Sequence, residues 1–187
     1  LLIFEVSETK KITNKNREKF NIGAVHLYSK VKTTVREQFW KNQEILMNLN
    51  KNNVDVIVGD LNLTPFDLNL RDDSIIKISD SRTEINYLSK NKEIKKELWY
   101  NPMWNFLGDH KFNGDRRLSG TFYLESDFFS LHLIDGILLN SSVMDKLDFA
   151  NSLIIESDGA SNFFDYKFKL KKFPSDHLPQ FYKLNNE

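Results

Sequence analysis

The stretch VDVIVGDLNLTP, residues 54–65, constrains this chain more than any other. Its first five residues are nearly all β-branched, and a short apolar run of this kind, ended by Gly59, is typical of a buried strand. Gly59 would then let the backbone turn. Asp60 and Asn62 follow two residues apart, so an extended backbone would point both side chains the same way. Pro65 then disfavours a continuing sheet ladder. A carboxylate and an amide at this position indicate either a functional site of a layered α/β protein or an Asx-rich turn.

Ionisable residues interrupt three other parts of the chain. His26 lies in one apolar, strand-like run and Asp135 in another. Asp176 and His177 lie between two prolines, directly before the last apolar segment. Because Leu and Ile flank Asp135 on both sides, its carboxylate needs a hydrogen-bonding partner. Asp and His are also the residue types that general acid–base chemistry uses most often.

Four segments together resemble a known family: VHL at 25–27, GDLN at 59–62, IDG at 134–136 and SDHLP at 175–179. In this order and at these spacings they are similar to motifs of the endonuclease/exonuclease/phosphatase superfamily. This group includes deoxyribonuclease I, abasic-site endonucleases, neutral sphingomyelinases, inositol polyphosphate phosphatases and deadenylases. The resemblance covers most of the chain and corresponds to the C-terminal portion of the family domain.

The resemblance implies a phosphoesterase that depends on Mg²⁺, or on Mn²⁺ in its place, with nucleic acid as the leading substrate. His177 and Asp135 would form the proton-accepting pair. Asp60 would orient or activate the attacking water, and Asn62 would hydrogen-bond a phosphate oxygen. His26 would contact the phosphate or assist the leaving group.

Further roles are expected for residues outside this set. Asp176 would reach the metal, because a hard cation prefers carboxylate oxygen. Arg116 and Arg117 would contact phosphate through their planar guanidinium groups, although surface solubility explains them nearly as well. His110 and His132 match no motif and are expected to be structural.

One expected element of the family is missing. The family carries its metal-binding Glu on a segment that has no counterpart before Val25. We therefore expect an incomplete domain over residues 1–187, and a complementing N-terminal segment or chain as a partner. Without that Glu, the chain alone should bind Mg²⁺ weakly and hydrolyse phosphodiesters little.

Composition limits the class of protein without choosing a substrate. Lys and Arg total 26, as do Asp and Glu. The zero net charge gives no support for the basic surface of many nucleic-acid binders, though it permits a local basic face. The chain has no Cys, which excludes disulfides and thiolate zinc sites. No signal peptide or membrane span is visible, and a cytoplasmic location is expected.

The predicted fold class is α/β. The resemblance implies part of a four-layer sandwich of two mixed β-sheets flanked by helices, of the deoxyribonuclease I type. The pattern predicts strands at 1–8, 20–28, 54–58, 75–78, 131–139 and 163–170, and helices at 32–49, 66–70 and 87–98. The helix at 32–49 has a capping box, Thr34 with Glu37 three residues later.

Three functions stay open at this point. The first is a nuclease, and the second is a phosphatase or lipid phosphodiesterase on the same scaffold. The third is a non-catalytic binding fragment that kept the pocket and lost the metal ligand. Basic residues around the pocket would favour nucleic acid, whereas an apolar rim would favour lipid.

Overall fold

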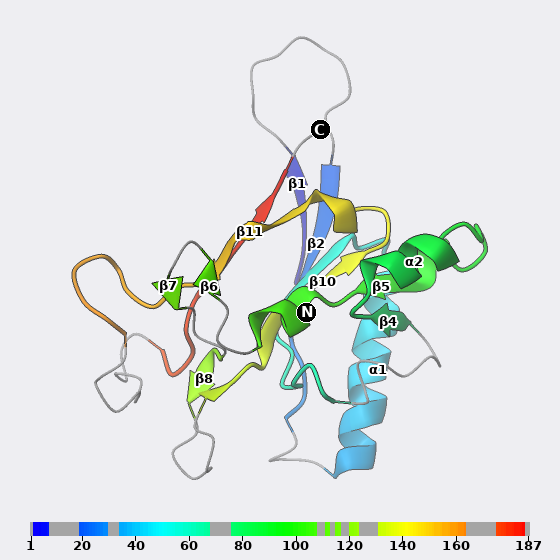
Figure 1. The fold of residues 1–187 in the computed structure, drawn as a ribbon. Helices are drawn as coiled ribbons and strands as arrows, with labels where there is room; N and C mark the ends of the chain where they lie inside the picture. The colour runs from blue at the N-terminus through cyan, green and yellow to red at the C-terminus, as the bar shows by residue number, and fades with distance from the viewer. Residues whose placement is uncertain are drawn as a thin grey trace.

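The computed structural model describes residues 2–7, 19–29, 34–67, 76–107, 111–112, 115–116, 120–123, 131–163 and 175–185. They form an α/β fold built on a mixed six-stranded sheet, so the predicted class is confirmed (Figure 1). The strand order is β1-β2-β3-β10-β5-β4. These strands are β1 (Leu2–Ser7), β2 (Lys19–His26), β3 (Val56–Asp60), β4 (Lys77–Ser79), β5 (Leu98–Tyr100) and β10 (Asp135–Asn140).

The late strand β10 lies in the middle of this sheet. It pairs antiparallel with both β3 and β5. On the far side of β3, β2 runs parallel to it and continues into an antiparallel pair with β1. The C-terminal ends of β2 and β3 therefore lie at the same edge of the sheet as the N-terminal end of β10.

The helix α1 (Val35–Lys51) makes the crossover between β2 and β3. It begins at the predicted capping box, in which the Glu37 N–H donates to Thr34 Oγ1 at 3.3 Å and the Thr34 N–H donates to Glu37 Oε2 at 3.1 Å. Such reciprocal capping satisfies N–H groups that the first helical turn leaves unpaired. The predicted helix is thus confirmed, shifted by two or three residues at each end.

Both faces of the sheet are buried, as the alternation along β10 shows. Leu138 packs with Leu46 and Leu49 of α1 on one face. Ile137 and Leu139 belong to a second apolar cluster on the other face. Successive strand residues point to opposite faces, so a strand with apolar residues at both parities must be covered twice.

The second face is covered by α2 and a two-stranded antiparallel sheet. Within this cluster, Ile85 comes from α2 (Arg82–Leu88), Ile154 from β11 (Leu147–Ile154) and the partly buried Tyr182 from β12 (Gln180–Leu184). The four-layer sandwich with two large sheets stays a prediction, because this second sheet has two strands among the described residues. The remaining short elements are η2 (Lys95–Glu97), η3 (Pro102–Phe106), η4 (Met144–Lys146), β6 (Lys111–Phe112), β7 (Asp115–Arg116), β8 (Phe122–Tyr123) and β9 (Leu131–His132).

The predicted solvated helix at 87–98 is wrong. The helix in this region is α2, which begins five residues earlier, at Arg82, after the cap Ser81, whose Oγ accepts from the Glu84 N–H at 3.2 Å. It ends at Leu88, and the fully buried strand β5 follows η2. Burial of Trp99 on one face of β5 outweighs the helical propensity of the Lys- and Glu-rich residues before it.

Other boundaries also differ from the sequence prediction. The predicted strand at 131–139 is divided into β9 and β10 by residues 133–134. Of the predicted helix at 66–70, residues 66–67 belong to a turn or its end, and the rest lies outside the described residues. All but the first residue of the predicted strand at 163–170 lies outside them as well.

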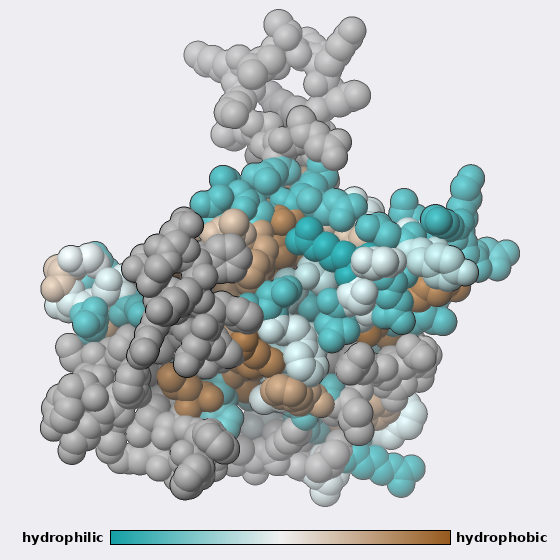
Figure 2. Space-filling view, in the orientation of Figure 1, coloured by the Kyte–Doolittle hydropathy of each residue, from teal (hydrophilic) through white to brown (hydrophobic). Residues whose placement is uncertain are grey.

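The surface over α2 is mainly hydrophilic, whereas hydrophobic residues are exposed in the middle and lower part of the same view (Figure 2). Within the described parts of the chain, no helix has both the length and the apolar character needed to cross a membrane.

Candidate functional site

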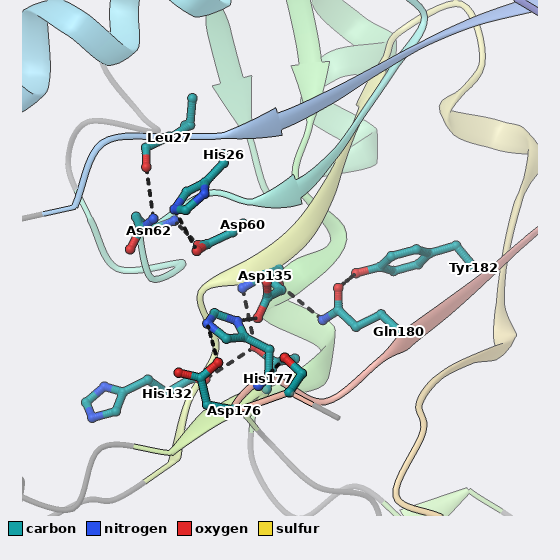
Figure 3. Close-up of polar contacts among 12 residues, drawn as sticks. His26, Leu27, Asp60, Asn62, His132, Asp135, Asp176, His177, Gln180 and Tyr182 are labelled. Carbon is teal, nitrogen blue, oxygen red and sulfur yellow. Dashed lines mark hydrogen bonds and ion pairs between the residues drawn. The ribbon is translucent and has the colours of Figure 1, made fainter. Parts of the chain in front are cut away.

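Three ionisable residues form a row across neighbouring strands at one edge of the sheet (Figure 3). His26 ends β2 and is the register partner of Asp60, which ends β3. Asp135 begins β10 and is the register partner of Asp60 on the other side. Residues directly opposite one another in neighbouring strands share a face of the sheet. The topology therefore brings together three residues that lie more than thirty positions apart in sequence.

Gly59 lets β2 and β3 approach each other closely; it does not form a turn after β3. It has φ +134°, and a Cβ at this position would lie 2.1 Å from the Val25 carbonyl oxygen. A side chain could not fit there, so glycine is required for the strands to pair. The predicted turn at Gly59 is wrong, because β3 continues through it and ends at Asp60.

Asn62 lies in the left-handed region with φ +49°, so the predicted extended backbone between Asp60 and Asn62 is wrong. Its N–H donates to Asp60 Oδ1 at 2.8 Å, which makes the Asx turn that the sequence left open. Its Nδ2 donates to the Leu27 carbonyl at 2.9 Å. The turn thus holds the Asp60 carboxylate in a fixed orientation at the end of the strand.

Asp135 and His177 form the hydrogen bond that the resemblance implied. His177 Nδ1 lies 2.7 Å from Asp135 Oδ2, and the two side chains are 26% and 16% exposed. The His177 ring also lies against the Phe122 ring, with centroids 4.8 Å apart. A carboxylate at Nδ1 fixes the tautomer of the imidazole and leaves Nε2 as the atom that can accept a proton.

Asp60, Asp135 and His177 make up a group that could hold a metal ion, since one ligand atom of each lies within 4.8 Å of the others. Burial raises the pKa of Asp60 above 3.8, and the negative charge of Asp135 adds to this effect. The hydrogen bond from His177 to Asp135 raises the pKa of His177 above 6.5, and the charges of Asp135, Asp60 and Asp176 act in the same direction. The site therefore attracts positive charge.

Two predicted residues lie at the solvent-exposed side of the site. The His26 imidazole is 76% exposed, and its Nε2 lies 3.4 Å from Asp60 Oδ2. Asp176 is 75% exposed, and its Oδ1 lies 4.0 Å from His177 Nε2. Both side chains are thus accessible from solvent.

The remaining predicted residues are not brought into this group by the described structure. Arg116 ends the short strand β7, and Arg117 lies outside the described residues, so their contact with phosphate stays a prediction. His110 also lies outside them. His132 lies in β9, where its carbonyl accepts from the Thr121 N–H at 2.8 Å.

Three supporting residues were missed by sequence reasoning. The buried Thr121 accepts the Asp135 N–H at Oγ1 (3.3 Å), and its carbonyl accepts the Leu178 N–H (2.7 Å). Gln180 Nε2 donates to the Asp135 carbonyl at 3.1 Å, and its Oε1 accepts from the Tyr182 hydroxyl. Burial, followed by the Asp135 charge, raises the pKa of Tyr182 well above 10. Gln180 stands directly after SDHLP, which was the signal available in the sequence.

Comparison with known proteins adds little to this geometry. No protein-family model matches the sequence, and no curated protein matches it significantly. Among solved structures, the 3′ phosphatase NExo from Neisseria, bound to a product DNA hairpin, is similar with a TM-score of 0.46 and 12% identity. The similarity covers 89% of this chain and 61% of that one. A likeness at this level establishes neither family nor activity, so the case for a function rests on the site itself.

Proposed function

We propose that this chain is a divalent-cation-dependent phosphoesterase that hydrolyses phosphodiester bonds, with nucleic acid as its substrate. The observation that carries the proposal is the hydrogen-bonded Asp135–His177 pair beside a second, partly buried carboxylate, Asp60. Hydrolysis of a phosphodiester needs a base for the attacking water and positive charge for the developing phosphorane. The site provides the base, and its carboxylates would hold a cation that supplies the positive charge.

The residues present fit a hard divalent cation such as Mg²⁺ or Mn²⁺. Carboxylate oxygens are the ligands that both ions prefer, and Asp60 and Asp135 supply them side by side. Burial, and then the charge of Asp135, raises the pKa of Asp60, so a bound cation would favour its ionised form. Asp176 stays the predicted further ligand. When bound, the cation would neutralise charge on a non-bridging phosphate oxygen.

His177 is the proposed base. Its Nδ1–H donates to Asp135, so Nε2 can take a proton from a water molecule as the water oxygen attacks phosphorus. The protonated ring that results is stabilised by three carboxylates, those of Asp135, Asp60 and Asp176. The phosphorus–oxygen bond to the leaving group then breaks, and the leaving oxygen must receive a proton.

His26 is the proposed source of help for the leaving oxygen. Its exposed imidazole stands beside Asp60, with Nε2 3.4 Å from Asp60 Oδ2. Asn62 is proposed to hydrogen-bond a phosphate oxygen from the fixed turn. The proposed scaffold of residues 1–187 is part of a sandwich of the deoxyribonuclease I type.

A cleavage assay with defined substrates tests this function. The chain is incubated with Mn²⁺ or Mg²⁺ and supercoiled plasmid, single-stranded RNA, a phosphomonoester or sphingomyelin, with EDTA as the metal-free control. We expect slow, cation-dependent nicking or cleavage of nucleic acid by the wild type, in line with the weak activity expected of this chain alone, and loss of it in His177→Ala. Asp158→Asn, an exposed carboxylate in the 157–162 loop, serves as the matched control.

The substrate arms separate the alternatives. Cleavage of only the phosphomonoester or only sphingomyelin would replace the nuclease by a phosphatase or a lipid phosphodiesterase. Nuclease activity that survives in His177→Ala would point to a contaminant and overturn the proposal.

A further inference from the structure

We propose that Phe66 and Trp104 form a stacking platform for a nucleobase of single-stranded nucleic acid, beside the phosphate that is cleaved. This inference rests on the proposed function and adds to it the part of the substrate that is recognised. The two rings meet edge to face, with centroids 4.6 Å apart and planes at 74°. Phe66 is 65% exposed and Trp104 is partly buried. A partly buried ring thus supports an exposed one.

The platform lies at the same edge of the sheet as the row formed by His26, Asp60 and Asp135. Phe66 follows Asp60 by six residues, a span of at most about 20 Å even when fully extended. Trp104 belongs to η3, and so does Met103, the residue before it. Met103 lies directly against Gly136, where an added Cβ would be 2.9 Å from Met103 Cγ. Because Gly136 follows Asp135 in β10, η3 flanks the site. Even at the stacked, double-helical rise of about 3.4 Å per nucleotide, a span of about 20 Å holds at most about six nucleotides, so the platform is within about six nucleotides of the proposed scissile phosphate.

The turn that carries Phe66 is held by hydrogen bonds. The Asp67 N–H donates to the Thr64 carbonyl at 2.9 Å, and Thr64 Oγ1 donates to Asp67 Oδ2 at 3.0 Å. Pro65, which directly precedes Phe66, is buried. The exposed ring is therefore presented by a defined backbone.

The segment that carries Trp104 is held in the same way. The Met103 N–H donates to Asn101 Oδ1 at 3.0 Å, and Asn105 Nδ2 donates to the Pro102 carbonyl at 3.1 Å. Aromatic side chains that are already ordered lose little conformational entropy on binding. A pair of this kind is thus suited to bind a flat ring.

A nucleobase fits this platform better than a lipid surface does. Insertion into a membrane interface needs a broad apolar face, usually with basic residues around it, whereas Phe66 is followed by Asp67 and Trp104 by the exposed Asn105. The balanced charge of the chain also limits how much affinity phosphate contacts can supply. Base stacking provides affinity that does not depend on net charge and tolerates any sequence.

The test measures binding of fluorescein-labelled, single-stranded oligonucleotides in EDTA, so that binding is read without cleavage. Wild type is compared with Phe66→Ala, Phe66→Tyr and the control Tyr87→Ala, which removes a 71%-exposed aromatic ring from α2. We expect Phe66→Ala to weaken binding by about 5- to 150-fold, the range for loss of one stacked base. Phe66→Tyr and Tyr87→Ala should bind as the wild type does.

Abasic substitutions identify the partner of the ring. Replacing one nucleotide at a time by an abasic residue should weaken binding to the wild type at one position. The same substitution should change binding to Phe66→Ala less than twofold, because the base has lost its platform. Equal affinity of wild type and Phe66→Ala would overturn the inference.

The outcomes also separate the two proposals. Cleavage by the wild type with Phe66-independent affinity would leave the nuclease and remove the platform. Phe66-dependent binding without cation-dependent cleavage would leave the platform and remove the nuclease. Phe66-dependent binding to phosphatidylserine vesicles with none to oligonucleotides would overturn the inference in favour of a lipid surface.

Discussion

Asp135 lies directly opposite Asp60 in the antiparallel pair of β10 and β3. Two carboxylates in register on neighbouring strands repel one another when both are ionised. The pKa of Asp60 is accordingly raised, first by burial and then by the charge of Asp135, despite the N–H of Asn62 that lowers it. The fold thus tolerates a local electrostatic penalty at neutral pH, as expected if the row serves the proposed binding or catalysis.

Asp60→Asn should make the apo protein more stable at pH 7. A carboxyl group whose folded pKa is raised contributes stability that is complete below its unfolded value, 3.8, and lost as pH rises through the folded pKa. Wild type carries this loss at pH 7 and the amide does not. Thermal unfolding of both proteins in EDTA at pH 7 and pH 3 checks the sign. An advantage of the variant that persists undiminished at pH 3 would contradict the assignment.

In the presence of Mn²⁺ or Mg²⁺, the wild type should be more stable than Asp60→Asn. A ligand at one hundred times its dissociation constant stabilises the folded state by about 2.7 kcal/mol, which corresponds to a rise in Tm of about 5–10 °C for a chain of this size. We expect this rise for the wild type and a much smaller one for Asp60→Asn. Differential scanning fluorimetry over a range of cation concentrations measures it. Equal shifts in both proteins would place the cation elsewhere.

Asp135→Asn should preserve the fold and lower turnover by about 10²- to 10⁴-fold, because the amide no longer fixes the tautomer of His177 or stabilises its protonated ring. The substitution should also lower the pKa of His177 toward 6.5, since the hydrogen bond to Asp135 is the main reason that this pKa is raised. NMR titration of the His177 ring reads this without an activity assay. Asp145→Asn, an exposed carboxylate in η4, is the control.

The hydrolysis rate should rise with pH through the pKa of His177, which lies above 6.5. The ring must be unprotonated to accept a proton from water. The same group contributes stability in the opposite sense: its contribution is complete below 6.5 and is lost as pH rises through the raised pKa. A pH–rate profile beside a pH–stability profile checks both slopes. A rate that falls over this range would assign His177 as an acid instead.

Gly59→Ala should destabilise the protein by more than about 3 kcal/mol, because the new Cβ would meet the Val25 carbonyl and φ is +134°. Gly159 offers a matched control, since it also has positive φ but its Cβ would meet nothing within 4 Å. Gly159→Ala should cost only about 1–2 kcal/mol for the backbone conformation. Urea denaturation separates the steric contribution from the conformational one.

The sequence singled out His26 and Asp135 because each interrupts an apolar run, and Asp60 because it follows one; the family resemblance then assigned all three to one site. It also predicted α1 from Thr34 and Glu37, which interact over three residues. It failed where long-range burial decides, as at Trp99 in β5. It failed again at Gly59, because a glycine that allows two strands to approach looks the same in sequence as one that allows a turn.

The supporting shell shows the same limit. Gln180 and Thr121 act on the backbone of Asp135 from 45 and 14 residues away. A side chain that bonds to a distant backbone group carries no local sequence pattern. The place of Gln180 directly after SDHLP could have marked it as a candidate, but register and topology had to be known before either residue could be assigned its role.

The central position of β10 governs how the protein must fold. Its neighbours β3 and β5 are synthesised first, yet they cannot join into one sheet until residues 135–140 leave the ribosome and insert between them. Until then β3 has an open edge available to other chains. Non-local pairing of this kind closes slowly, so a chain stopped before residue 135 should aggregate, and the carboxylate row should form only in the last cooperative step of folding.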